Sequence, residues 1–169
     1  MKNTIIIWIL LTTVTFVHAR DEVYVPHGFI KQSINLLDKK ASIVAIEVSK
    51  WRGPEKLIDV KVLDVLHETN DLLKLTRVYD DGFDPIFGKQ FKSGSKWILR
   101  IQLRTVDGQK QWVVSYYETS YLELVKDTVV GSIAKHKVKK KMKYSDFKAL
   151  LTKEIAKKNP NKQDASDGN

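Results

Sequence analysis

The strongest pattern in the sequence is an alternation of apolar and polar residues between Ser95 and Glu118. From Trp97 to Arg104 the apolar positions recur with period two, which is typical of a β-strand with one buried face. Asp107-Gly108 follows, and this dipeptide tolerates the positive φ angles of a tight type I′ turn. The alternation resumes at Trp112, so the stretch predicts a β-hairpin.

The turn also predicts how the two strands of this hairpin pair. With Asp107-Gly108 at the tip, the residues that face one another on the buried side are Leu103 with Trp112, Ile101 with Val114, and Leu99 with Tyr116. The residues on the outward side are Arg104 with Gln111 and Arg100 with Ser115. Because a slip of one residue would place apolar side chains on both sides, the turn and the hydrophobic pattern favour the same register.

The rest of the pattern predicts a mainly β chain with a helix at each end. The expected elements are a helix over 29–40, strands over 42–50, 57–66, 72–79, 121–125 and 128–134, and a last helix over 144–158. In the strand over 57–66 the apolar phase changes between Val62 and Leu63, as it does at a β-bulge. The long connection over 79–94 carries three Phe residues, which are expected to fold back over an open end of the core.

The two ends of the chain lie outside this pattern. Residues 1–19 have a basic start, an apolar run of thirteen residues and Val17-His18-Ala19 before an expected cleavage site, which is typical of a secretory signal peptide. The alternative is a retained membrane anchor, although the run is shorter than the roughly 20 residues that span a bilayer. We therefore expect an exported protein, periplasmic or extracellular, with one domain over 20–158 and a polar, disordered tail over 159–169.

Several short strands, with a bend in the second, suggest a small closed barrel. Three stretches carry a more specific resemblance: ASIVAIEV over 41–48, VKVLDVL over 60–66 and FKSGSKWIL over 91–99. In this pattern the chain resembles the OB-fold barrel, in particular its netrin-like branch, which includes the tissue inhibitors of metalloproteinases. Small secreted bacterial proteins of unassigned function look similar. The resemblance covers roughly residues 41–133 and implies a closed, OB-like antiparallel barrel flanked by helices.

The resemblance departs from the family at one decisive point. The tissue inhibitors depend on an N-terminal Cys and a disulfide framework, and this chain contains no Cys. The resemblance therefore implies the fold of those inhibitors but not their inhibitory mechanism. A chain of this length is expected to be held together by its hydrophobic core alone.

The positive charge of the chain is concentrated near its C-terminus. The formal net charge is +9, and residues 135–162 contain eleven Lys against two acidic residues. The densest part contains Lys135, Lys137, Lys139, Lys140, Lys141 and Lys143. This segment either binds a polyanion, such as acidic lipid headgroups or cell-wall polymers, or is a solvated connector between elements. Because it has no Arg and few aromatic residues, its composition does not favour nucleic acid.

One pair of large side chains is expected on the outward face of the hairpin. Tyr117 lies beside Ile98 there, and Trp51 follows the first strand, so these three residues are candidates for a protein-binding surface. In the alternative, one of the two helices covers this face and the pair belongs to the core.

The sequence contains no arrangement of residues that indicates catalysis or a cofactor. Without Cys, thiol catalysis and thiolate metal sites are excluded. His27, His67 and His136 do not have metal-binding spacing, and a Gly-x-Ser-x-Gly motif is absent. The acidic stretch Asp80-Asp81-Gly82-Phe83-Asp84 lacks the spacing of an EF-hand, which favours a turn-rich loop over a calcium site. We therefore expect no catalytic residues, no cofactor and no bound metal.

Together these observations predict a secreted or periplasmic, non-enzymatic protein that acts through protein–protein contacts. The alternative is a protein that binds a polyanion or the envelope surface through Lys135–Lys143. An enzyme is the third class, and no constellation of residues in the sequence supports it.

Overall fold

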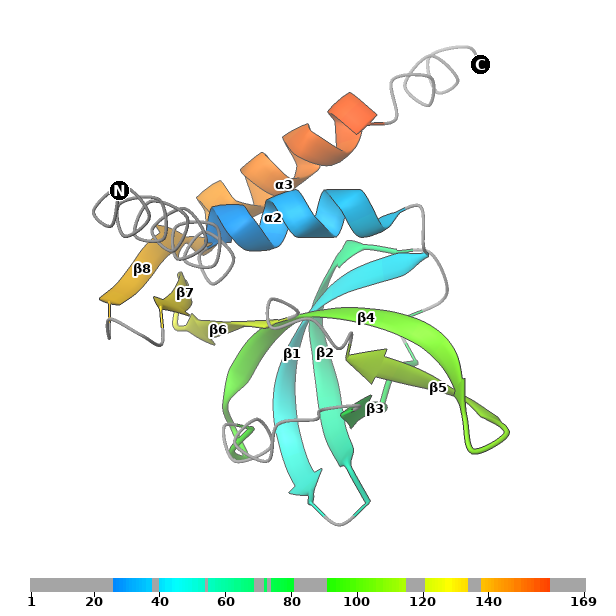
Figure 1. Cartoon of the computed structure of the whole chain (residues 1–169). Helices are drawn as coiled ribbons and strands as arrows, with labels where there is room; N and C mark the ends of the chain where they lie inside the picture. The colour runs from blue at the N-terminus through cyan, green and yellow to red at the C-terminus, as the bar shows by residue number, and fades with distance from the viewer. Residues whose placement is uncertain are drawn as a thin grey trace, which may run out of the picture.

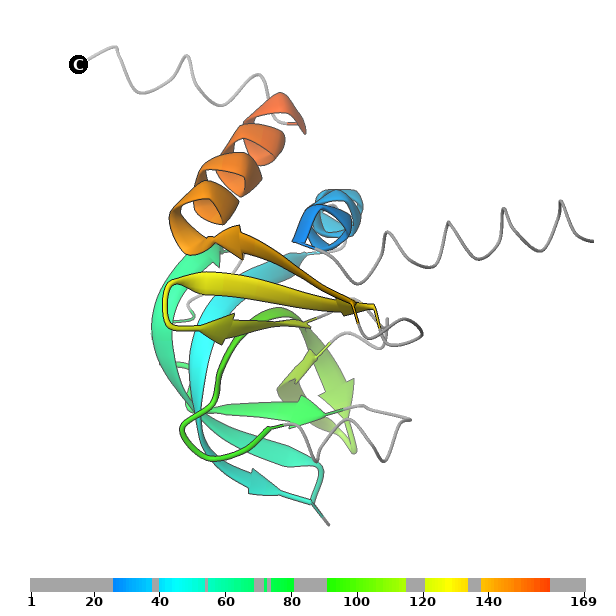
Figure 2. The same cartoon turned by 90° about the vertical axis from the view of Figure 1, so that its left-hand side faces the viewer.

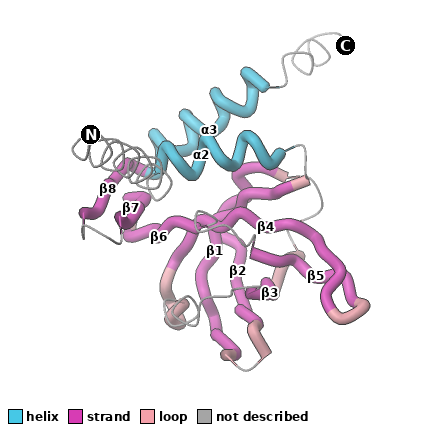
Figure 3. Tube along the Cα trace, viewed as in Figure 1, coloured by secondary structure: helices cyan, strands magenta, loops and turns pink. Residues whose placement is uncertain are grey.

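The computed structural model describes residues 26–37, 40–53, 55–68, 72, 74–80, 91–114, 121–133 and 138–158. Within these ranges the chain is mainly β, as predicted, with a helix near each end (Figures 1 and 3). In chain order the elements are α2 (Pro26–Leu36), β1 (Ala41–Arg52), β2 (Leu57–His67), β3 (Arg77–Asp80), β4 (Lys96–Val106), β5 (Gln109–Val114), β6 (Tyr121–Val125), β7 (Thr128–Ile133), β8 (Val138–Lys143) and α3 (Tyr144–Lys158). The predicted signal peptide and polar tail lie outside the described residues.

Five of the strands form a closed ring of hydrogen-bonded neighbours. The order around the ring is β1-β2-β3-β5-β4, and β4 pairs in turn with β1. These pairings are antiparallel except that of β3 with β5, which is parallel. β6, β7 and β8 extend the sheet outward, because β6 pairs with β4 beside the part of β4 that pairs with β5. β4 is therefore the strand that joins the ring to the extension.

The β4–β5 hairpin has the predicted register. Its Cα partners include Ile101 with Val114, Leu103 with Trp112 and Arg104 with Gln111. Asp107 and Gly108 form the turn with φ angles of 49° and 77°, and positive φ at both central residues is what a type I′ turn requires. Tyr116 and Ser115, the predicted partners of Leu99 and Arg100, lie outside the described residues.

The end of this hairpin extends beyond the ring (Figure 1). Leu103 is 40% exposed, and Trp112 is only half-buried at the margin of the core. The prediction that both residues belong to the buried face is therefore wrong for Leu103 and holds in part for Trp112. The alternation continues along the strands past the point where other elements cover them.

Apolar side chains form two cores on the two faces of β1 and β4. The ring core contains Val44, Ile46, Val48, Ile58, Val60, Leu72, Leu75, Val78, Phe91, Trp97, Leu99, Ile101 and Val114. The helix core, between the strands and the two helices, contains Phe29, Ile30, Ile43, Ala45, Ile98, Leu122, Leu124, Val129, Phe147 and Leu151. Figure 2 shows α2 and α3 on the same side of β7 and β8. Burial on both faces explains why the start of β1 is a nearly continuous apolar run.

The phase change in β2 is the predicted β-bulge. Ala45 and Ile46 are consecutive in β1, but their partners in β2 are Asp64 and Val62. Leu63 between these partners is therefore the extra residue of the bulge. Val65 beyond the bulge packs against the ring core, as expected, but Leu63 is 40% exposed and the prediction of its burial is wrong. The bulge turns Asp64 away from the ring core and toward α3, where it accepts a hydrogen bond from the Tyr144 hydroxyl.

Some boundaries differ from the prediction. α2 begins earlier, at Pro26, because a proline suits the first turn of a helix. The strand expected over 72–79 exists only as β3; Leu72 and Leu75 are buried in a turn in which the Leu75 N–H donates to the Leu72 carbonyl (3.0 Å). Phe91 of the long connection is buried against the ring core, as expected, whereas residues 81–90 lie outside the described residues. The bounds of α3 are those predicted.

Candidate functional site

The lysine-rich segment, in which no strand was expected, contains β8. β8 pairs with β7, and Met142 lies opposite Val129. Met142 packs against the helix core, so Lys141 and Lys143 point to the other face of the sheet because side chains alternate along a strand. Lys140, Lys141 and Lys143 are all exposed, and we call these three residues the β8 lysines.

β8 is the outermost strand of the extension. Among the strands that the structure describes it pairs only with β7, so its second edge has no strand partner. Lysines along such an edge disfavour the addition of a strand from another chain. Lys139 also belongs to β8, where it lies opposite Ser132, whereas Lys135 and Lys137 lie outside the described residues.

The expected protein-binding surface at Ile98 is not exposed. Ile98 is 0% exposed and belongs to the helix core, so helices cover this position, as the alternative expectation had it. Tyr117 lies outside the described residues. Trp51 is half-buried and packs against the ring core, and its ring lies close to Gly53. The prediction of an exposed Ile98–Tyr117 pair is therefore wrong for Ile98.

Arg100 occupies the predicted outward side of β4 but is fully buried there. Its guanidinium lies over the ring of Phe29, 5.7 Å from the ring centre, and its Nη1 donates to Ser33 Oγ (3.5 Å). Both partners belong to α2, which covers this part of the sheet. Arg100 therefore holds α2 in place and is not available to a ligand from solvent.

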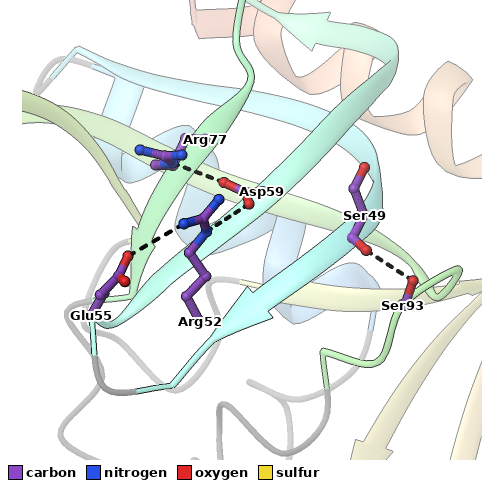
Figure 4. Close-up of polar contacts among 6 residues, drawn as sticks. All are labelled: Ser49, Arg52, Glu55, Asp59, Arg77 and Ser93. Atoms are coloured by element: carbon purple, nitrogen blue, oxygen red, sulfur yellow. Dashed lines mark hydrogen bonds and ion pairs between the residues drawn. The ribbon is translucent and has the colours of Figure 1, made fainter.

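A second polar cluster lies on the outer face of β2 and β3 (Figure 4). Asp59 accepts a hydrogen bond from Arg52 Nε at one carboxylate oxygen and from Arg77 Nε at the other, each at 2.8 Å. Arg52 Nη1 also lies 3.8 Å from Glu55 Oε2. Hydrogen bonds from Arg77 and then Arg52 hold the pKa of the Asp59 carboxyl below its ordinary value.

No pattern in the sequence indicates this cluster. Arg52 and Asp59 are seven residues apart, and Arg77 is eighteen residues beyond Asp59, so no local motif joins them. They meet because β2 pairs with β3 in a register that places Asp59 opposite Arg77. A prediction that starts β3 at Arg77 and pairs it with β2 would have placed Arg77 opposite Asp59.

A third cluster attaches α3 to β2. The Tyr144 hydroxyl donates to Asp64 Oδ2 (3.0 Å), and Lys148 Nζ donates to the same oxygen (3.1 Å) while lying over the Tyr144 ring. Burial, followed by the bond to Asp64, raises the pKa of the Tyr144 hydroxyl. Tyr144 therefore remains a protonated hydrogen-bond donor, and the geometry suits a structural clamp rather than proton abstraction.

The described residues do not include a metal-binding group. No three side chains of His, Cys, Asp or Glu lie close enough together in that part of the chain to hold an ion. His27 is exposed on α2 and His67 ends β2, whereas His136 lies outside the described residues. Asp80 is buried at the end of β3, and the rest of the acidic loop that follows is likewise not described.

Comparison with known proteins gives no relative from which a function can be carried over. No protein family, no curated protein and no solved structure matches the chain. Neither α2 nor α3, the helices in the described ranges, has the length and apolar character needed to cross a membrane. The clusters of side chains described above are therefore the features that bear on function.

Proposed function

We propose that this protein is an exported, non-enzymatic binding protein that attaches to an anionic envelope surface through the β8 lysines. The observation that carries the proposal is the arrangement of Lys140, Lys141 and Lys143 on one exposed outer strand. Export is supported by the signal-peptide pattern of residues 1–19.

The local charge supports this proposal. Lys126, in the tight turn between β6 and β7, is exposed, and Thr128 after this turn lies opposite Lys143. The acidic residues described on β6, β7 and their turn are Glu123, which is half-buried, and Asp127. The described part of the extension therefore carries an excess of positive charge, which attracts anionic headgroups or polymers.

For the fold, we infer that the ring forms a closed, OB-like barrel of the kind seen in the netrin-like branch. Support comes from the ring order β1-β2-β3-β5-β4 and from the five-stranded nature of the OB-fold. In this interpretation β6, β7, β8 and the two helices are additions on one side of the barrel, and β8 is the strand furthest from it.

A protein partner is the second candidate, and the end of the β4–β5 hairpin favours it. Leu103 is 40% exposed and lies opposite the half-buried Trp112, which gives the projecting end of the hairpin an apolar face. Trp residues are enriched at protein contacts, and apolar side chains that are exposed together mark such surfaces. This face lies on β4 and β5, whereas the anionic surface would contact β8. Substitutions in the hairpin and substitutions in β8 therefore test the two candidate functions separately.

The proposed function is tested with vesicles of phosphatidylcholine that contain 30% phosphatidylglycerol. The triple change Lys140→Gln, Lys141→Gln and Lys143→Gln is expected to weaken vesicle binding about hundredfold, because each lysine near an anionic surface contributes about 1 kcal/mol. Sedimentation of the vesicles measures the bound fraction. The folded state is expected to be unaffected because all three side chains are exposed.

The matched control is a second triple change, Lys92→Gln, Lys110→Gln and Lys153→Gln. These lysines are also exposed, but they lie before β4, on β5 and on α3. The control removes the same charge and is expected to weaken binding less than about threefold. Equal losses in the two variants would contradict a site on β8, and the absence of vesicle binding in the unchanged protein would favour the protein partner.

A further inference from the structure

The Arg52–Asp59–Arg77 cluster has an arrangement that the proposed function does not use. It lies on the outer face of β2 and β3, near the β1–β2 turn and at the end of the ring away from the helices (Figures 1 and 4). β8, which carries the β8 lysines, lies at the other end of the molecule, on the side of the helices (Figure 1).

Both guanidinium groups bind Asp59 through Nε alone and keep most of their other N–H donors open. A guanidinium has five N–H donors, and both Arg52 and Arg77 bind Asp59 through Nε. Among the residues that the structure describes, Arg77 has no polar contact besides Asp59, and Arg52 has in addition only the 3.8 Å approach to Glu55. Both Nη groups of Arg77 and Nη2 of Arg52 are therefore available to a ligand.

Asp59 fixes both side chains before any ligand binds. Its two carboxylate oxygens each accept one Nε–H at 2.8 Å, and its side chain is 20% exposed. The side chains of Arg52 and Arg77 are 36% and 49% exposed, so they are ordered but accessible. Ordering free arginine side chains adds to the cost of binding an anion, and here the protein has already ordered them.

The charge around the cluster favours an anion. Lys50 lies directly opposite Asp59 on β1 and is exposed, so the cluster has three cations and the two carboxylates of Asp59 and Glu55. Because Asp59 is flanked by cations on both neighbouring strands, its charge is balanced within the protein and one positive charge is left over. An incoming anion is therefore attracted rather than repelled.

We propose that Arg52 and Arg77 form a binding site for one oxyanion group, a carboxylate or a phosphate, of a ligand. The N–H donors of two ordered, planar guanidinium groups match the two oxygens of a carboxylate or two oxygens of a phosphate. This chemistry occurs in an acidic peptide and in a phosphate-bearing small molecule. The site does not depend on the β8 lysines, and its ligand is recognised by geometry rather than by total charge.

The test is a titration of the full-length protein with inorganic phosphate and, separately, with tri-glutamate. The Nε–Hε resonances of Arg52 and Arg77 are followed by NMR. We expect saturable shifts of both resonances with a Kd on the order of 1 mM for at least one of the two anions. Tighter binding of phosphate would identify a phosphate-bearing ligand, and tighter binding of tri-glutamate would identify an acidic peptide.

Two variants distinguish a site that depends on the guanidinium geometry from a surface that attracts anions by its positive charge alone. Arg77→Lys keeps the positive charge but removes the planar guanidinium and its paired N–H donors. It is expected to weaken anion binding about tenfold or more. Lys61→Gln removes a charge from exposed Lys61, two residues along β2 from Asp59, and is expected to weaken binding less than about twofold. If Arg77→Lys is poorly folded by circular dichroism, Arg52→Lys serves in its place. Equal losses in the two variants, or shifts that do not saturate for either anion, would overturn the proposal.

Discussion

Replacing Trp97 with alanine is expected to lower the free energy of unfolding by about 3–5 kcal/mol. Trp97 is 6% exposed in the ring core, and its ring makes edge-on contacts with Phe91 and Tyr121, with ring centres 5.0 Å and 5.7 Å away. Its indole N–H donates to Ser95 Oγ (2.8 Å). Alanine leaves a cavity and removes both aromatic contacts, each of which adds to the burial energy. Urea denaturation followed by fluorescence or circular dichroism measures the loss.

Trp112→Ala is the matched control, because it makes the same chemical change on the neighbouring strand. Trp112 is half-buried at the margin of the ring core, so the variant is expected to lose less than half as much stability as Trp97→Ala. Similar losses for the two variants would contradict the placement of Trp97 in the centre of the core and Trp112 at its margin.

Phe29→Ala is expected to cost a similar amount, about 3–5 kcal/mol, for a different reason. Phe29 is 0% exposed, packs against Phe147 of α3 with ring centres 6.1 Å apart, and covers the Arg100 guanidinium. An isolated helix as short as α2 is not stable in water, so α2 depends on this packing. Its loss opens the helix core and exposes Arg100, which urea denaturation and hydrogen exchange at the amides of Ile98 and Arg100 would both detect.

Lys31→Ala on the same helix is the comparison for Phe29→Ala. Lys31 is exposed, so its replacement is expected to change stability by less than about 0.5 kcal/mol. A loss below about 1 kcal/mol for Phe29→Ala would mean that α2 is not part of the cooperative core, and that Ile98 is accessible in solution after all.

The features that the sequence predicted well are those whose causes are local. Asp107-Gly108 sets the turn, and the turn sets the register of Leu103 with Trp112, so both follow from a short stretch of chain. The bulge in β2 is likewise visible as a change of apolar phase. Burial along the hairpin was less predictable, because it depends on where the other elements end.

The features that the sequence did not predict depend on contacts between distant segments. Ile98 and Arg100 lie on the face of β4 that was expected to point outward, and they are buried because α2, some seventy residues earlier, packs over them. β8 was missed because consecutive lysines hide the alternation that Met142 completes. The pair of Arg52 and Arg77 exists only through the pairing of three strands.

If the β8 lysines act together on an anionic surface, binding must depend steeply on salt, and that dependence must decrease when these lysines are removed. The affinity for dextran sulfate is measured over a range of salt concentrations for the unchanged protein and for the variant with Lys140, Lys141 and Lys143 changed to Gln. Each lost lysine–anion contact reduces the slope of log affinity against log salt by roughly 0.7–0.9, so we expect the slope of the β8 variant to be smaller by roughly 2–3. The Lys92, Lys110 and Lys153 variant should keep nearly the slope of the unchanged protein. An unchanged slope in the β8 variant, or equal reductions in the two variants, would contradict an anion-binding site on β8.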